Sequence, residues 1–120
     1  MNNTKQIADR LAALCRKGDW EAAQKELYST DAVSIEQEEM PGASKETKGL
    51  KAIIDKGHQW ASMVESVHVI EVGEPVVAGD AIALRMRMDM TMKGRGRTEM
   101  AELCVYETKG GKIVSERFFS

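Results

Sequence analysis

A strict two-residue alternation over residues 85–92 constrains this chain more than any other feature of its sequence. The segment reads Arg-Met-Arg-Met-Asp-Met-Thr-Met. Successive side chains of a β-strand point to opposite faces of the sheet, so this pattern is typical of a strand whose two faces meet different surroundings. Glycines follow within residues 93–97, and residues 98–106 alternate again. The sequence therefore predicts a long β-hairpin.

The position of the turn decides which residues share a face of this hairpin. A turn centred on Gly94 and Arg95 pairs Met92 with Arg97 and places Arg87 opposite Glu102, and we favour this register. A shift by one residue would exchange the pattern on one strand and place Glu102 against a methionine. The favoured register predicts a polar face that carries Arg85, Arg87, Asp89, Thr91, Thr98, Met100, Glu102, Cys104 and Tyr106. The opposite, methionine-rich face carries Met86, Met88, Met90, Met92, Arg97, Glu99, Ala101, Leu103 and Val105.

Length and charge restrict the class of protein. A chain of 120 residues is predicted to form one domain over residues 1–120. Seventeen basic against 19 acidic residues give a net charge of −2, which offers no strong field for nucleic acid or an anionic membrane. No apolar run approaches the ~20 residues of a membrane span, and the first residues lack the apolar core of a signal peptide. We expect a cytoplasmic protein with Cys15 and Cys104 as buried free thiols.

The first half of the chain predicts three helices and one short strand. The first helix has Ile7, Leu11 and Leu14 on one stripe, with Asn3 or Thr4 as its cap, and it ends at Gly18. A second helix begins at Asp19. A strand over residues 32–37 follows, with a polar face that carries Ser34 and Glu36. Residues 38–48 read as a mobile loop and residues 50–64 as a third helix.

The second half of the chain predicts only strands. Residues 67–77 alternate imperfectly, and Gly79 and Asp80 turn the chain into the strand over residues 81–92. After the hairpin, Gly110 and Gly111 turn it once more into a last strand over residues 113–119. The prediction is an α+β fold with four antiparallel strands at its end.

Several short motifs, in this order and spacing, resemble the SnoaL-like branch of the nuclear transport factor 2-like superfamily. They are Leu27-Tyr28, Asp31-Ala32-Val33, Gly49 before a helix, Ala78-Gly79-Asp80-Ala81 and Gly111-Lys112-Ile113. The resemblance implies a cystatin-like cone, in which three N-terminal helices pack in a curved antiparallel sheet and the open end is a ligand pocket. It also implies a fold that carries both enzymes and binding modules, commonly as dimers through the outer sheet face.

Within that superfamily, the ketosteroid isomerases use one carboxylate as a base and a protonated carboxyl with a tyrosine in the oxyanion hole. The resemblance places Glu36 at the base and Glu102 near the oxyanion carboxyl. Leu11 stands where the tyrosine would be, which argues against a steroid isomerase of that design. Other acid–base chemistry stays open, such as the aldol-type ring closures of the SnoaL-like polyketide cyclases.

Glu102 is the strongest candidate, because it lies mid-strand between Met100 and Cys104. A carboxyl held there must be protonated or paired, and the alternative to catalysis is an ion pair with Arg87 across the hairpin. The alternative for Glu36 is a place on the surface at the end of a strand.

His68 is a third catalytic candidate, since its parity could bring it to the inner face, although a lone strand histidine is more often a core residue. The predicted substrate contacts are Arg87, Asp89, Trp60, Tyr28 and Met100. Tyr28 and Trp60 are most simply interpreted as aromatics at the edge of the core, with pocket lining as the alternative.

Neither histidine has a second ligand at metal-binding spacing, and no glycine-rich phosphate loop precedes a helix, so no metal or cofactor is predicted. Three function classes remain. One is an acid–base isomerase, cyclase or hydratase acting on a small apolar carbonyl compound. The others are a non-catalytic module that binds a small ligand, and a dimeric interaction module. We expect a homodimer through the face of Met86, Met88 and Met90, unless that face is the core.

Overall fold

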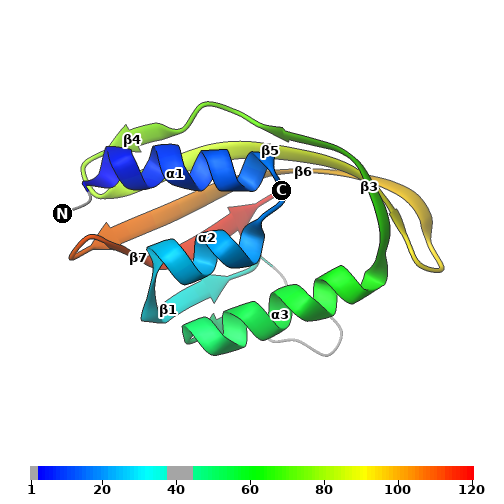
Figure 1. The fold of residues 1–120 in the computed structure, drawn as a ribbon, viewed down its shortest axis with the longest axis horizontal. Helices are drawn as coiled ribbons and strands as arrows, with labels where there is room; N and C mark the ends of the chain where they lie inside the picture. Colours follow the sequence, from blue (N-terminus) through cyan, green and yellow to red (C-terminus); the bar gives the residue numbers. More distant parts are fainter. Residues whose placement is uncertain (1–2, 38–44) are drawn as a thin grey trace.

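The computed structural model describes residues 3–37 and 45–120 as three helices and a seven-stranded sheet. In chain order the elements are α1 (Thr4–Arg16), α2 (Trp20–Leu27), β1 (Tyr28–Ile35), β2 (Glu46–Lys48), α3 (Leu50–Met63), β3 (Val64–Val72), β4 (Val76–Ala78), β5 (Ala81–Met92), β6 (Gly96–Lys109) and β7 (Lys112–Phe119). The strand order is β2-β1-β7-β6-β5-β3, and β4 pairs with β5 outside that path. The sheet curves around the helices, which lie on its concave side (Figure 1).

This architecture corrects two parts of the predicted fold. The sheet is mixed, because β1 pairs with β7 in parallel while the other pairs are antiparallel. The helices are not all N-terminal, since α3 follows β1 and β2. A parallel pair between the first and last strands needs a long connection, and residues 36–111 lie between them. The α+β class itself is confirmed.

The helices begin where the sequence predicts. Asn3 caps α1 with a side chain that accepts a hydrogen bond from the backbone N–H of Gln6 at 2.8 Å, while the Gln6 side chain accepts from the Asn3 N–H at 3.1 Å. Gly18, at φ 74°, ends the helix in the left-handed region that favours glycine. Asp19 occupies the cap position of α2 without a side-chain hydrogen bond.

The β5–β6 hairpin has a register one residue away from the prediction. Its loop has three residues rather than two, so Met92 pairs with Gly96, and Gly94 and Gly96 take φ values of 75° and 81°. Every later pair shifts accordingly. Arg87 faces Ala101, and Glu102 faces Met86. The predicted pair of Arg87 with Glu102 is therefore wrong, and Glu102 lies against a methionine.

The shifted register sorts the faces differently from the prediction. The concave face carries Met86, Met88, Met90 and Met92 together with Met100, Glu102, Cys104 and Tyr106. The convex face carries Arg85, Arg87, Asp89 and Thr91 together with Arg97, Glu99, Ala101, Leu103 and Val105.

The four β5 methionines belong to the core of a single chain. They are at most 8% exposed and join one buried cluster with the helix residues Ile7, Leu11 and Ile53. The prediction of a partner surface at Met86, Met88 and Met90 is wrong, because the helices already cover that face. A homodimer stays a prediction, and it would have to use another surface.

The remaining boundaries differ by a few residues. The first strand begins at Tyr28, and the predicted strand over residues 67–77 divides into β3 and β4 around Pro75, whose ring removes a backbone donor. Within the predicted loop, Glu46–Lys48 forms β2, and residues 38–44 lie outside the described residues. Both cysteines are buried free thiols, as predicted. Across the described ranges, no helix is long and apolar enough to cross a membrane.

Candidate functional site

A buried polar cluster lies on the concave face, where β1 and β7 pair. Ser34 and Glu116 are direct neighbours across this parallel pair, and both are less than 5% exposed. The Ser34 hydroxyl donates to Oε2 of Glu116 at 2.6 Å, and the Tyr28 hydroxyl donates to Oε1. Both carboxyl oxygens of Glu116 therefore have a hydrogen-bond donor inside the protein, as a buried carboxyl requires.

Lys56 reaches this cluster from α3. It lies three residues after the buried Ile53 and four before Trp60, so these side chains share the helix stripe that faces the sheet. The Lys56 ammonium donates to Oγ of Ser34 at 2.8 Å and lies 3.4 Å from Oε1 of Glu36. Its side chain is 23% exposed, and Nζ is 6.0 Å from the ring centre of Phe118. The cluster thus holds a mostly enclosed cation beside Glu36.

Glu102 lies on the same face, and no cation among residues 3–37 and 45–120 is bonded to it. Its Oε1 lies 3.9 Å from Sγ of Cys104. The pKa of the Glu102 carboxyl is raised to about 7, chiefly by burial and also by the negative charges of Glu36 and Glu116, while Cys104 and Lys56 act in the opposite direction. Of the two alternatives for Glu102, the structure supports the carboxyl that holds a proton near neutral pH over the ion pair with Arg87.

Glu116 differs from Glu102 in its partners. Burial raises the pKa of the Glu116 carboxyl, while the hydrogen bonds from Ser34 and Tyr28 and the charge of Lys56 act in the opposite direction. Burial also raises the pKa of the Tyr28 hydroxyl well above its usual value, so this group stays a donor. The concave face therefore combines carboxyls in different environments with one lysine, which is the kind of arrangement that separates an acid from a base.

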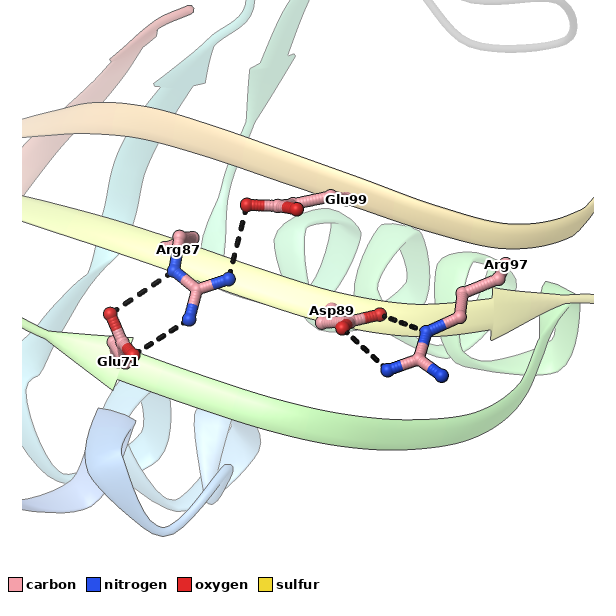
Figure 2. Close-up of polar contacts among 5 residues, drawn as sticks. All are labelled: Glu71, Arg87, Asp89, Arg97 and Glu99. Atoms are coloured by element: carbon pink, nitrogen blue, oxygen red, sulfur yellow. Dashed lines mark hydrogen bonds and ion pairs between the residues drawn. The ribbon is translucent and has the colours of Figure 1, made fainter.

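Arg87 and Asp89 lie on the convex face, where they form ion pairs with their neighbours (Figure 2). Arg87 donates to Glu71 at 2.6 and 3.1 Å and to Glu99 at 3.1 Å. Asp89 accepts from Arg97 at 2.8 and 3.0 Å. The structure separates both residues from Glu102, so their predicted place on one face with it is wrong, as the hairpin register requires.

His68 is also on the convex side. It is exposed, and its Nε2 lies 2.7 Å from Oγ1 of Thr91. The β3–β5 pairing is irregular between Val67 and Val69. The prediction of an inward-facing His68 side chain depended on strict alternation along this strand, which the irregularity breaks. The structure therefore does not bring His68 to Glu36 and Glu102.

The other predicted residues remain on the helix side of the sheet. Trp60 and Met100 are half-buried against the core, and Tyr28 is buried as a donor to Glu116. Leu11, at the position of the missing oxyanion tyrosine, is 1% exposed.

Three members of the cluster were not predicted from the sequence as site residues: Ser34, Lys56 and Glu116. Glu116 had a readable signal, because it lies between Val114 and Phe118 in a strand, as Glu102 lies between Met100 and Cys104. Lys56 could be found only from its spacing to Ile53 and Trp60 on the helix. Ser34 was placed on a polar strand face, but its partners could not be read from the sequence.

A hollow of about 430 Å³ opens to the surface between α2, β1 and α3. Its lining comprises Lys25, Thr30, Leu50, Lys51, Ile54 and Asp55. It shares no residue with the polar cluster. Among residues 3–37 and 45–120, no group of three histidine, cysteine or acidic residues is arranged to hold a metal ion.

Comparison with known proteins places this arrangement in a family. The model of the SnoaL-like domain matches residues 2–120. A crystal structure from Mesorhizobium loti, described as a proposed SnoaL-like polyketide cyclase and also as a carbohydrate phosphatase, is 36% identical, with coverage of 96% of this chain and 97% of that chain and a TM-score of 0.88.

More distant structures share the fold. A protein of unknown function with a cystatin-like fold from Xanthomonas campestris is 19% identical, with 100% and 91% of the two chains covered and a TM-score of 0.82. A proposed isomerase from Bacillus subtilis is 20% identical, with 97% and 87% covered and a TM-score of 0.71. The search of curated proteins found no match. The matched residues and the 36% identity show that the chain belongs to the SnoaL-like domain family.

Proposed function

We propose that the concave face is an acid–base site for a small, mainly apolar carbonyl compound, in an isomerase, cyclase or hydratase type of reaction. Glu102 is the proton donor and Glu36 is the base. One observation carries this proposal: in the described part of the chain no cation is bonded to Glu102, and its pKa of about 7 leaves a proton available at neutral pH.

The proposed step moves one proton at each end of the substrate. Glu36 accepts a proton from a carbon next to the carbonyl, and the electron pair of that C–H bond shifts toward the carbonyl oxygen. The Glu102 O–H donates a hydrogen bond or its proton to that oxygen, so the enol forms without a free charge. The protonated Glu36 then returns its proton to the same carbon, to a conjugated carbon so that a double bond moves, or to the oxygen of a second carbonyl that the enol carbon attacks. In each case the enol oxygen returns its proton to Glu102.

The environments of the two carboxyls fit these opposite roles. Glu36 directly follows β1, with its side chain 32% exposed and the Lys56 ammonium 3.4 Å from its Oε1, so a cation lies beside this carboxyl. Glu102 lies among Met86, Met100 and Cys104, which favour the protonated form. The 36% identical relative described as a proposed SnoaL-like polyketide cyclase supports this class of chemistry.

The test is exchange of α-protons for deuterium, followed by NMR on a panel of cyclic ketones and 1,3-dicarbonyl compounds in D₂O. Glu36→Gln should lower the catalysed rate by roughly 10²–10⁴-fold, as removal of a general base does. Glu102→Gln should lower it by roughly 10²–10³-fold, as for one lost oxyanion donor. Glu99→Gln on the convex face is the matched control and should leave the rate unchanged.

A second candidate is a binding module without catalysis. The open hollow of about 430 Å³, with the apolar Leu50 and Ile54 in its wall, favours it. In this case a ligand would shift NMR signals of residues around the hollow while no compound of the panel exchanged faster than in buffer. Exchange that is catalysed and lost in Glu36→Gln would exclude the binding module.

A further inference from the structure

Lys56 is held on the concave face by a chain of hydrogen bonds that runs in one direction. An ammonium group can only donate, so Oγ of Ser34 is the acceptor in the 2.8 Å contact with Lys56. The Ser34 hydroxyl hydrogen is then free to point at Glu116, whose Oε2 is 2.6 Å away. Tyr28 donates to the other oxygen of Glu116. The buried carboxyl is therefore joined to the ammonium through one serine hydroxyl.

The burial of these groups makes the arrangement costly to leave incomplete. Glu116 is 4% exposed and Ser34 is 0% exposed, so neither can exchange its partner for water. No buried side-chain nitrogen or oxygen lacks a hydrogen-bond partner in the described part of the chain. The charge of Lys56 acts on the buried Glu116 carboxyl, and the Ser34 hydroxyl joins the two groups by hydrogen bonds.

We propose that Glu116, acting through Ser34, is a positioning group that fixes the Lys56 ammonium beside Glu36. Lys56 bridges the two carboxyls, with Ser34 on one side and Glu36 on the other. The cation holds the Glu36 carboxyl at a fixed position, while Glu116 fixes the Ser34 hydroxyl that accepts the hydrogen bond from Lys56. The consequence for Glu36 rests on the proposed function. The placement of Lys56 does not.

The placement can be measured without any substrate, by competitive labelling of lysines with acetic anhydride and mass spectrometry. Lys51 and Lys93 are exposed and serve as references within the same molecule. We expect Lys56 to be labelled at least about tenfold more slowly than these references, because a hydrogen-bonded, mostly enclosed ammonium is protected. Labelling of Lys56 at the same rate as Lys51 would overturn the proposal.

Variants of Ser34 and Glu116 test whether the protection of Lys56 depends on this series of hydrogen bonds. Ser34→Ala removes the bridging hydroxyl and should raise Lys56 labelling several-fold, and Ser34→Thr, which keeps a hydroxyl, should restore protection. Glu116→Gln, of nearly the same shape, should raise labelling in the same way. The buried thiol of Cys15 should stay unreactive in each variant, which shows that the fold is intact. Protection that survives both Ser34→Ala and Glu116→Gln would contradict the proposal.

The exchange assay separates this inference from the proposed function. If both are correct, Ser34→Ala lowers kcat with little change in KM, and Ser34→Thr recovers most of the loss. If the wild-type protein exchanges no compound but the labelling follows the expected pattern, the acid–base function fails and the positioning of Lys56 stands. If exchange is catalysed and Ser34→Ala leaves both labelling and kcat unchanged, the positioning inference fails alone.

Discussion

Arg87 and Glu102 lie on opposite faces of the β5–β6 hairpin, although the two residue pairs to which they belong follow one another along the hairpin. Arg87 faces Ala101, and Glu102 faces Met86. The guanidinium bonds to Glu71 and Glu99 on the convex face, so it is not available to the concave carboxyl. Glu102 is left without a bonded cation, and burial raises its pKa to about 7. A one-residue difference in the hairpin loop thus decides the chemistry of the concave face.

Glu102→Gln is expected to stabilise the protein at pH 8. The pKa of Glu102 is about 7 in the folded state against an ordinary value of 4.5, so the folded state binds the proton more tightly than the unfolded state. The free energy of unfolding contributed by this group therefore falls as pH rises from 4.5 to 7 and stays low above that range. Because the group is partly exposed, we expect a gain on the order of 2 kcal/mol at pH 8.

Urea unfolding at pH 4 and pH 8 measures this effect. The difference between Glu102→Gln and wild type should be small at pH 4, where the carboxyl is protonated in both states, and should grow toward pH 8. Glu99→Gln, on the convex face of the same strand, should show no such growth. A Glu102→Gln difference that is the same at both pH values would show that the carboxyl does not hold its proton in the folded protein.

Met88→Lys is expected to unfold the protein. Met88 is 3% exposed within the core, and a lysine there would place a charge among apolar side chains at a cost of several kcal/mol. Met88→Leu keeps the volume and should cost less than about 1.5 kcal/mol. Circular dichroism and size-exclusion chromatography check both variants. A folded, soluble Met88→Lys monomer would return the methionine face to the partner surface that the sequence predicts.

Local patterns predicted most of the fold, but they could not determine the length of the β5–β6 loop and therefore which residues of the two strands share a face. The alternation over residues 85–92 establishes the strand and its two faces. Which face is buried depends on how the strand pairs, and a loop of two or three residues around Gly94 is compatible with the same sequence. The charged side chains do not resolve this choice, because Arg87 finds carboxylates on the convex face as well.

The candidate site shows the same division between local and distant information. Glu102 could be selected from its own strand, because apolar neighbours on both sides imply burial. The environment of Ser34 could not be predicted from its own strand. Its acceptor, Glu116, lies 82 residues away in the sequence, and its donor, Lys56, lies on a helix 22 residues away. Such contacts depend on the parallel pairing of β1 with β7, for which no short-range pattern exists.

His68→Ala and Arg87→Gln should leave catalysed exchange unchanged. Both residues lie on the convex side, where His68 contacts Thr91 and Arg87 bonds to two glutamates. Their electric influence on the concave carboxyls is weakened by the intervening sheet and by solvent. The α-proton exchange assay, run at equal concentrations of folded protein, checks this expectation. A large loss of kcat in either variant would place the reaction on the convex face and would contradict the assignment to Glu36 and Glu102.

Tyr28→Phe is expected to destabilise the protein more than Tyr106→Phe, although both tyrosines are at most 6% exposed. The Tyr28 hydroxyl donates to the buried Glu116 carboxyl, and its loss leaves a buried acceptor without one of its donors, at a cost of about 1–3 kcal/mol. The Tyr106 hydroxyl interacts with the Cys104 thiol, a weak partner, so its removal should cost less.

A double-mutant cycle with Glu116→Gln identifies the source of the difference. If the hydroxyl of Tyr28 stabilises the fold through the Glu116 carboxylate, its removal in the Glu116→Gln background should cost clearly less than in wild type, by about 0.5–3 kcal/mol. The same cycle with Tyr106→Phe should show additive free energies of unfolding. Additivity in the Tyr28 cycle would mean that Tyr28 acts through packing alone, and that Glu116 depends on Ser34 and Lys56 for its stabilisation.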